Sequence, residues 1–235
     1  MEDAKLLKPA QYAENQILTA ILEGKYPPGA CLPGERALAQ ELGVTRPTLR
    51  ETLHRLAAEG WIAIRHGKPT IVNDYWTKGG LGLLSTMARY GQFLPKNFIV
   101  HLLELRLVLI PSVAAMASER NPEDLARHLA LAKILDDDPE AFAQYDWSLQ
   151  ELMAKASKNF TFPMILNDFG PLFKSLAHTY FSLAKGRAAS KKYYSSLARA
   201  LELGPEAVKQ AARAAMQDSI AIWNDLHQKE GGLHD

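Results

Sequence analysis

The first third of the chain changes from helical to strand-like spacing of its apolar residues. Apolar side chains first recur every three or four residues, as they do along one face of a helix. After Gly60, two short runs rich in β-branched residues follow, and HGKP joins them as a hairpin turn would. In chain order, the expected elements are helices at 9–24, 35–42 and 46–59 and strands at 62–65 and 70–73.

From Leu81 onward the apolar spacing is helical, and the alternation typical of strands is missing. Pro111 and Pro171 lie inside two expected helices, where we expect them to bend or break the helix. The expected helices lie at 81–92, 96–119, 123–135, 139–158, 162–184, 187–203 and 205–229. The expected division is a first domain at 1–73, a linker at 74–80 and an all-helical domain at 81–230.

Length and composition limit the class of protein. The chain has 235 residues, 47% of them hydrophobic and 23% charged, which suits one large globular domain or two smaller ones. The single cysteine, Cys31, excludes an internal disulfide framework and a thiolate-rich zinc site. No apolar run approaches the roughly 18 residues that span a bilayer, and the N-terminal residues lack the apolar stretch of a signal peptide. We therefore expect a cytoplasmic protein without a membrane partner.

The helix expected at 46–59 combines a buried face with a basic flank. Leu49, Leu53 and Leu56 recur at helical spacing, so one face is buried. Arg46 and Arg50 lie on the flank, near the start of the helix. A shorter helix precedes it across a turn, as in helix-turn-helix proteins, whose second helix reaches base edges in the major groove. Both arginines are therefore candidates for DNA contact, because the arginine fork can donate twice to guanine.

The formal net charge is only +1, so a surface for nucleic acid must be local. Between residues 45 and 68, five basic residues oppose two acidic ones, an excess of three (5 − 2). The hairpin suits a wing. Gly67 would allow the protein backbone to approach the DNA closely, while His66 and Lys68 would contact the DNA backbone or minor groove. An ordinary amphipathic helix with solvated arginines also explains the flank. The order of helix, turn, capped basic helix and hairpin is more specific and favours DNA binding.

The stretch PPGACLPGERALAQELGVTRPTLRETLHRLAAEGWIAIRHGKPTIVNDYW resembles the winged-helix domain of the GntR family of bacterial transcription regulators. More narrowly, the chain is similar to the FadR regulators of fatty-acid metabolism, with PPG, GVTR and HGKPT in the same order. The resemblance covers the entire chain and is looser after residue 76. It implies a mainly α fold, with an N-terminal winged helix-turn-helix, a small β-hairpin wing and an all-α C-terminal ligand-binding bundle.

The resemblance also implies which residues bind double-stranded operator DNA. The arginines are expected to contact bases or phosphates, the threonines phosphates, and the wing the minor groove. With Lys68 of the hairpin, the expected DNA-binding residues are Arg36, Thr45, Arg46, Thr48, Arg50, His66 and Gly67. Pro47 stands where these relatives commonly have threonine, so one hydroxyl contact is in question. The family binds palindromic sites as a homodimer, so a homodimer is expected.

For the helical domain, the resemblance implies binding of long-chain fatty acyl-CoA, which releases such regulators from genes of fatty-acid degradation and synthesis. The expected effector-binding residues are Phe173, Tyr180, Met216, Asp218, Ser219 and Trp223. Plain core packing explains the apolar stripe around Phe173 and Tyr180 as well. Met216 stands where relatives usually carry glycine, and Asp218 where they carry glutamate. These departures leave the affinity and the preferred chain length open.

The alternative is a GntR-family regulator that senses a different small molecule, such as an organic acid bound with the help of a metal. A sibling branch of the family binds metal through one aspartate and three histidines. Here Asp146 is followed four residues later by Gln150 instead of histidine. The histidines without a matching partner are His101, His128 and His178. We therefore expect no metal site and no cofactor.

Motifs of enzymes are missing or misplaced. A di-metal carboxylate site needs Glu-x-x-His on two helices, and the chain has it only at Glu51–His54. GKPT resembles a phosphate loop, but proline follows Lys68 and no glycine stands at Ile62. We therefore expect that the protein is not an enzyme.

Overall fold

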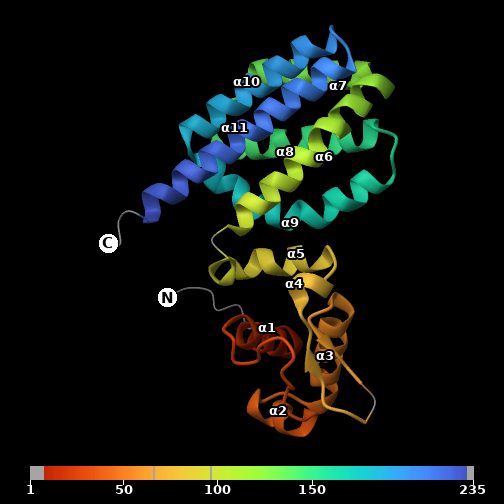
Figure 1. The fold of residues 1–235 in the computed structure, drawn as a ribbon, viewed down its shortest axis with the longest axis vertical. Helices are drawn as coiled ribbons and strands as arrows, with labels where there is room; N and C mark the ends of the chain where they lie inside the picture. The colour runs from red at the N-terminus through yellow and green to blue at the C-terminus, as the bar shows by residue number, and fades with distance from the viewer. Residues whose placement is uncertain (1–7, 66, 96, 232–235) are drawn as a thin grey trace. The chain divides into compact units, whose positions relative to one another are not determined.

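The computed structural model describes residues 8–65, 67–95 and 97–231, and the chain forms two compact units (Figure 1). The first unit is Met1–Leu94 and the second is Pro95–Asp235. Each unit buries its own set of apolar side chains.

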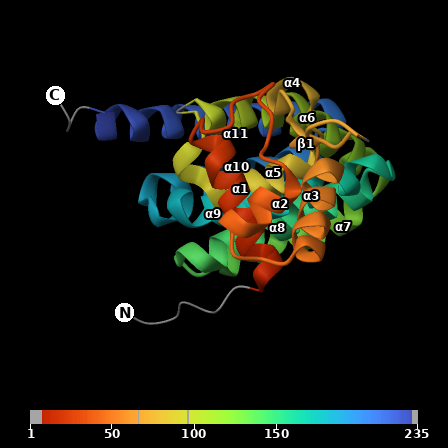
Figure 2. The ribbon, with the colours of Figure 1, turned by 90° about the horizontal axis from the view of Figure 1, so that it is seen from below.

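The first unit consists of short helices and one hairpin. Its elements are α1 (Pro9–Leu22), α2 (Glu35–Glu41), α3 (Arg46–Glu59), β1 (Ile62–Ala63), β2 (Ile71–Val72), α4 (Tyr75–Lys78), α5 (Gly82–Met87) and the 3-10 helix η1 (Ala88–Phe93). Both α1 and α2 pack against α3, and the three helices lie together in Figure 2. Helix, turn, helix and hairpin in this order confirm the expected winged helix-turn-helix.

Local sequence accounts for both ends of α3. Thr45 has an extended backbone at the N-cap, and its hydroxyl oxygen accepts a hydrogen bond from the Thr48 amide at 3.3 Å. Gly60 ends the helix in the left-handed conformation, with φ of 93°, which is strained for residues with a side chain. Leu49 and Leu56 are fully buried. Burial of this leucine face leaves the basic flank exposed.

The hairpin is shorter than expected. β1 and β2 pair antiparallel with two residues each, whereas runs of four residues were expected to pair. The Lys68 amide donates to the Arg65 carbonyl at 3.2 Å, so the turn already begins at the end of the first expected strand. At the base of the hairpin, Trp61 is fully buried and its ring centroid lies 4.9 Å from that of Tyr75. The base of the hairpin is therefore fixed to the core of the first unit.

The segment expected as a linker packs as part of the first unit. It contains α4, and α5 and η1 follow it on the same unit. The Thr86 hydroxyl donates to the Glu59 carboxylate at 2.9 Å, and the Tyr90 hydroxyl donates to the Asn15 side chain at 2.9 Å. These contacts join α5 and η1 to α3 and α1. The first compact unit therefore extends to Leu94, and the expected domain boundaries stay a prediction.

The second unit is all-helical within the described residues. Its elements are α6 (Phe98–Arg120), α7 (Pro122–Leu131), the 3-10 helix η2 (Ala132–Ile134), α8 (Pro139–Ala156), α9 (Thr161–Ser182), α10 (Ala184–Leu201) and α11 (Pro205–Gly231). α11 packs against α6 and α10, while α8 packs against α6 and α9 (Figure 1). The all-α bundle expected from the sequence is confirmed. α6 and α9 continue through Pro111 and Pro171, so neither proline breaks its helix.

Aromatic side chains form much of the core of the second unit. Phe142 of α8 is fully buried, and its ring centroid lies 5.7 Å from that of Phe181 on α9. Tyr145 meets Tyr194 of α10 edge to face, with centroids 4.7 Å apart. Such pairs add to the stabilisation that burial of their large apolar area supplies.

α6 is more apolar than expected from the sequence. Its mean hydropathy reaches 1.9 over a window of 18 residues, so by length and composition alone it could cross a membrane. The expectation that no apolar run approaches this length was wrong. The core helix of a globular protein meets the same criterion, and α6 packs against α8 and α11. Its apolar residues also line a cavity in the second unit.

Candidate nucleic-acid interface and ligand cavity

The three arginines expected to bind DNA line one surface depression of the first unit. Arg36 lies on α2, Arg46 and Arg50 lie near the start of α3, and all three are exposed. The depression is lined by Gly34, Glu35, Arg36, Ala37, Gln40, Arg46 and Arg50. Nε of Arg50 donates to Oε2 of Glu35 at 2.7 Å, which holds this guanidinium beside the start of α2. Grouped arginine side chains suit phosphate oxygens and the guanine edge.

The N-terminus of α3 adds hydroxyls and backbone amides to this surface. The hydroxyl oxygens of Thr45 and Thr48 lie 2.8 Å apart. Amides in the first turn of a helix lack partners within the helix, and the N-terminus attracts anions. Pro47 lies in this turn, where it supplies neither an amide hydrogen nor a hydroxyl. The other groups at this end of α3 suit a phosphate.

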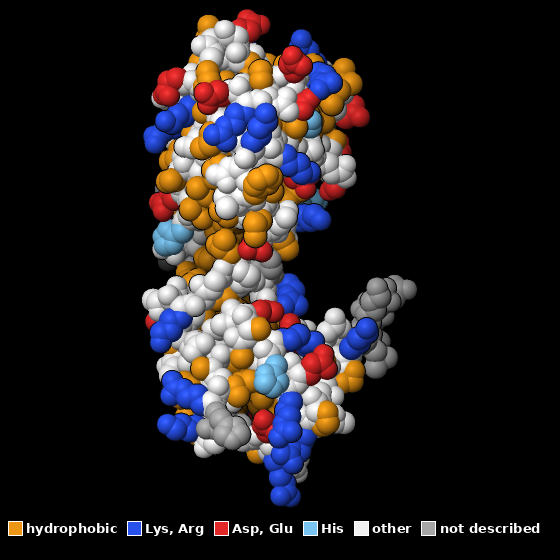
Figure 3. All heavy atoms as spheres, turned by 90° about the vertical axis from the view of Figure 1, so that its right-hand side faces the viewer, with side chains coloured by type: hydrophobic (Ala, Val, Ile, Leu, Met, Phe, Trp, Pro, Cys, Tyr) orange, Lys and Arg blue, Asp and Glu red, His pale blue; other side chains and the backbone are white. Residues whose placement is uncertain are grey.

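The turn of the hairpin is basic and exposed. Gly67 has φ of 67°, a conformation that favours glycine. Lys68 is exposed beside it, and His66, the other residue expected here, lies outside the described residues. Figure 3 shows lysine and arginine side chains gathered at the end of the first unit that α2, α3 and the hairpin form. Basic side chains at this end provide the local charge that binding to DNA requires.

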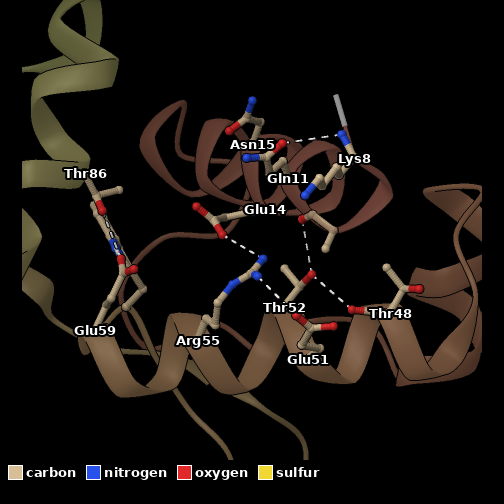
Figure 4. A network of polar contacts seen from close by, with 12 residues as sticks. Lys8, Gln11, Glu14, Asn15, Thr48, Glu51, Thr52, Arg55, Glu59 and Thr86 are labelled. Atoms are coloured by element: carbon tan, nitrogen blue, oxygen red, sulfur yellow. Dashed lines mark hydrogen bonds and ion pairs between the residues drawn. The ribbon is translucent and has the colours of Figure 1, made fainter. Parts of the chain in front are cut away.

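Arg55 differs from the other arginines of α3, because it points toward α1 (Figure 4). Its Nη2 lies 3.0 Å from Oε2 of Glu14, and its Nη1 lies 3.3 Å from Oε1 of Glu51. Glu14 is only 8% exposed and also pairs with Arg89 at 3.1 Å. The positive excess of residues 45–68 is therefore smaller at the surface than the sequence suggests, since the charge of Arg55 is balanced within the fold.

Two further residues, Thr52 and Glu59, hold α3 in place (Figure 4). The hydroxyl of the fully buried Thr52 lies 3.1 Å from the Thr48 carbonyl and 3.3 Å from the Ala10 carbonyl of α1. At the other end of α3, Glu59 accepts hydrogen bonds from Thr86 at 2.9 Å and from the Trp61 indole at 3.2 Å. These contacts fix the orientation of the helix that carries the arginines.

Glu14 and Thr52 were not expected to have a role, because neither belongs to a motif. The available signal is their position: each is a polar residue on an apolar helix face. Glu14 lies three residues before Ile17, and Thr52 three residues after Leu49. A polar residue on a buried face needs a hydrogen-bonding or charged partner, but the pattern does not identify that partner.

A mostly apolar cavity of about 150 Å³ lies within the second unit. Residues of α6, α8, α9, α10 and α11 line it. Five of the six residues expected to bind the effector are among them: Phe173, Tyr180, Met216, Ser219 and Trp223. The aromatic stripe of α9 is therefore both a core surface and a cavity wall.

Asp218, the sixth residue, is not among the residues that line the cavity. Its Oδ2 instead pairs with Nζ of Lys192 on α10 at 3.1 Å. Met216, the other expected departure from the family pattern, lies in the wall and is 3% exposed. Of these two residues, only Met216 therefore contributes to the cavity wall.

The cavity wall also contains a buried polar group of side chains. Asp146 is 6% exposed and accepts hydrogen bonds from the Tyr194 hydroxyl at 3.0 Å and from Nε2 of Gln150 at 3.4 Å. Burial raises the pKa of Asp146, and the positive charge of Arg106 on α6 opposes that shift. Arg106, Asp146 and Gln150 all line the cavity, so its interior offers both apolar and hydrogen-bonding surface.

Within the described part of the chain, no three His, Cys, Asp or Glu side chains cluster as metal ligands would. The ring of His128 stacks on Tyr145 at 4.9 Å, and its Nε2 lies 3.2 Å from the Ser148 hydroxyl. His101 contacts Asn97 at 3.1 Å. These two histidines therefore have neighbours that explain their positions without a metal.

Family models match the chain in two consecutive parts. Residues 9–72 match the model described as bacterial regulatory proteins, gntR family. Residues 73–230 match the model described as the FadR C-terminal domain. The second match alone covers more than half of the chain.

Curated relatives are similar over nearly the whole length. The fatty acid metabolism regulator proteins of Yersinia pestis (strain Pestoides F) and Yersinia pseudotuberculosis (serotype O:1b) are each 36% identical over 223 residues. The alignment covers 94% of this chain and 93% of each relative. A solved structure described as "Lar controls the expression of the Listeria monocytogenes agr system and mediates virulence" matches with a TM-score of 0.57 and 18% identity. It covers 92% of this chain and 98% of that one, and shares the fold.

Proposed function

Because the chain belongs to the FadR branch of the gntR family of bacterial transcription regulators, we propose that long-chain fatty acyl-CoA releases it from palindromic operator DNA. Membership makes it a DNA-binding regulator of fatty acid metabolism and not an enzyme. The first unit binds DNA in this proposal, and the cavity of the second unit binds the effector. The active form is a cytoplasmic homodimer, because a palindromic site presents two identical half-sites to a two-fold symmetric protein.

The observation that supports DNA contact is the depression where Arg36, Arg46 and Arg50 meet. Arg46 and Arg50 lie at the N-terminal end of α3, the part of a recognition helix that reaches base edges. Arg36 on α2 is well placed for a phosphate beside the groove. Thr45 and Thr48 supply further phosphate contacts from the same end of α3, and the hairpin turn enters the minor groove.

Substitution of single arginines tests this assignment. Arg46→Ala and Arg50→Ala should each weaken operator binding by about 1–3 kcal/mol, the usual effect of losing an arginine directed at a base. Arg127→Ala is the matched control, because this arginine is exposed on α7 of the second unit. All proteins are compared by fluorescence anisotropy at one fixed salt concentration, since salt alone changes affinity strongly. Unchanged binding by both α3 variants would remove α3 from the interface.

The observation that supports an acyl-CoA effector is the apolar cavity, which five of the expected effector residues line. Apolar walls with a few convergent polar groups are typical of small-molecule sites. At about 150 Å³, the cavity has the size of an engineered cavity that accepts benzene. A long acyl chain therefore enters only if lining side chains move. The ligand then binds the conformation with displaced side chains more tightly than the other conformation. A release mechanism needs this difference in affinity.

Met216 tests the cavity as the site of the acyl chain. Replacing this buried methionine by alanine removes side-chain volume from the wall, so Met216→Ala should bind longer acyl chains more tightly than the unchanged protein. Lys192→Ala is a control in the same unit, because Lys192 is exposed and pairs with Asp218 away from the cavity. Identical chain-length profiles for the unchanged protein and Met216→Ala would place the chain elsewhere.

Operator release is the direct test of the whole proposal. A labelled palindromic operator bound to the protein is titrated with palmitoyl-CoA, with free CoA and with small organic acids. Release by palmitoyl-CoA alone is the expected result. Tight binding to DNA that ignores palmitoyl-CoA and responds to an organic acid would overturn the effector class and leave the DNA-binding assignment intact.

A further inference from the structure

Two polar atoms in the cavity wall have no hydrogen-bond partner among the residues that the structure describes. They are Oε1 of Gln150 and the hydroxyl of Tyr193. The two residues are 3% and 4% exposed, and both line the cavity. Buried polar atoms almost always have a partner, because leaving one unpaired destabilises the fold. Both residues line the cavity, so the two covered atoms become available to a ligand when lining side chains move.

The neighbouring Asp146 fixes which end of the Gln150 amide is available. Nε2 of Gln150 lies 3.4 Å from Oδ2 of Asp146, and a carboxylate only accepts hydrogen bonds. In the structure the amide nitrogen faces Asp146, so the amide oxygen is turned away from it. The other carboxylate oxygen accepts from Tyr194 at 3.0 Å. Tyr193, the next residue of α10, has its hydroxyl buried and unpaired.

The chemistry of the two atoms limits the groups that can satisfy them. The Gln150 oxygen needs a donor, whereas the Tyr193 hydroxyl can donate to an acceptor. A methylene chain offers neither, so a plain hydrocarbon tail would bury both atoms without a partner. A hydroxyl or a secondary amide both donates and accepts. A hydroxylated acyl chain carries the first of these groups, and the pantetheine arm of coenzyme A carries the second.

We propose that Gln150 and Tyr193 form a polar subsite inside the cavity that binds a hydroxyl or secondary-amide group of the ligand. The inference rests on the proposed effector role of the cavity and makes its ligand class more specific. The subsite discriminates by hydrogen bonding, because a ligand that fills the cavity without such a group leaves both atoms buried and unpaired.

Tyr193→Phe is the cleanest variant, since it removes only the unpaired hydroxyl. It should retain the stability of the unchanged protein, because no hydrogen bond within the described protein is lost. Gln150→Leu removes the second atom of the subsite. Tyr145→Phe is the matched control: the hydroxyl of this buried tyrosine donates to the His128 carbonyl at 3.0 Å, and Tyr145 does not line the cavity. The control should lower stability and leave ligand affinity unchanged.

Calorimetric titrations of the full chain with palmitoyl-CoA, β-hydroxypalmitoyl-CoA, palmitic acid and β-hydroxypalmitic acid distinguish the two sources of the polar group. If the group is a chain hydroxyl, the unchanged protein prefers the hydroxylated ligands, and Tyr193→Phe and Gln150→Leu each lose roughly ten-fold in affinity for them alone. If it is the pantetheine amide, both variants lose a similar factor for the two thioesters and nothing for the two free acids.

Two results would overturn the subsite. One is equal affinity of the unchanged protein, Tyr193→Phe and Gln150→Leu for every ligand that binds, which would leave the acyl-CoA proposal standing. The other is no binding of any of the four ligands to the unchanged protein, which would overturn the acyl-CoA proposal as well. Binding of β-hydroxypalmitic acid without either thioester, lost in both variants, would support the subsite and overturn only the acyl-CoA effector.

Discussion

Replacing Glu14 by glutamine should destabilise the first unit more than any change at an exposed carboxylate of α3. The Glu14 side chain is 10% exposed and lies 3.0 Å from Arg55 and 3.1 Å from Arg89. Glutamine keeps the shape of the side chain but removes the charge that balances both guanidinium groups. Arg55, which is half-buried, is then left without its buried counter-charge.

The expected magnitude follows from how much solvent screens each partner. Removing one member of a fully buried ion pair costs about 3–5 kcal/mol, and an exposed pair contributes about 0.2–1 kcal/mol. The side chains of Arg55 and Arg89 are 40% and 53% exposed, so the value for Glu14→Gln should lie between these limits, at about 2 kcal/mol. For a unit of this size, that corresponds to roughly 8–16 °C in Tm.

Glu51→Gln is the matched control, because Glu51 contacts the same arginine at 3.3 Å but its side chain is 67% exposed. An exposed pair of this spacing contributes about 0.3–0.5 kcal/mol. Urea unfolding with hydrogen exchange at the amides of α1 and α3 reports on the first unit directly. Equal effects of Glu14→Gln and Glu51→Gln, or no effect of Glu14→Gln, would refute the reasoning that burial sets the strength of this contact.

Three further predictions follow from single residues. Gly60→Ala should destabilise the protein by about 1–2 kcal/mol, because an L-residue is strained in the left-handed conformation. The added Cβ would lie 3.6 Å from the Gly79 Cα, an ordinary contact, so backbone strain is the expected cause. An unchanged urea midpoint would contradict it. Phe142→Ala should cost about 3–5 kcal/mol by opening a cavity in the core of the second unit, and a loss below about 1 kcal/mol in urea unfolding would mean that the core collapses around the site. Burial lowers the pKa of His128, so the unfolded chain binds its proton more firmly, and the free energy of unfolding should fall as pH drops below about 6.5. His128→Asn should flatten that slope, and an identical pH profile for the variant would assign the dependence to other groups.

Periodicity, caps and breakers predicted most of the fold, because these signals act within one or two helical turns. The helices from α1 to α3 and from α6 to α11 lie close to their expected ranges. Thr45 and Gly60 mark the ends of α3 through contacts with residues beside them. The strands were overestimated, because β-branched composition does not reveal where the turn of the hairpin begins.

The candidate sites were predictable only in part. The arginines of α3 and the last helix carry recognisable motifs, and the structure brings Arg36, Arg46 and Arg50 to one depression. The motif did not predict which residue faces the cavity. Asp218 and Ser219 are neighbours in the same motif, but only Ser219 lines the cavity, whereas Asp218 pairs with Lys192. A rotation of about 100° per residue along a helix separates such neighbours, and only the packed bundle decides which side becomes the cavity wall.

The sequence by itself determined the order of helices and hairpin, the basic flank of α3, the apolar stripe of α9 and the resemblance to FadR regulators. The tertiary structure decided that Arg55 serves the fold, since its partner Glu14 lies on another helix and also pairs with Arg89, 75 residues away in the chain. It also decided that the segment around α4 and α5 packs on the first unit and that Gln150 and Tyr193 meet the same cavity. Local propensities depend on near neighbours in the chain, whereas the pairing of buried charges and the lining of a cavity depend on which distant helix faces are packed together.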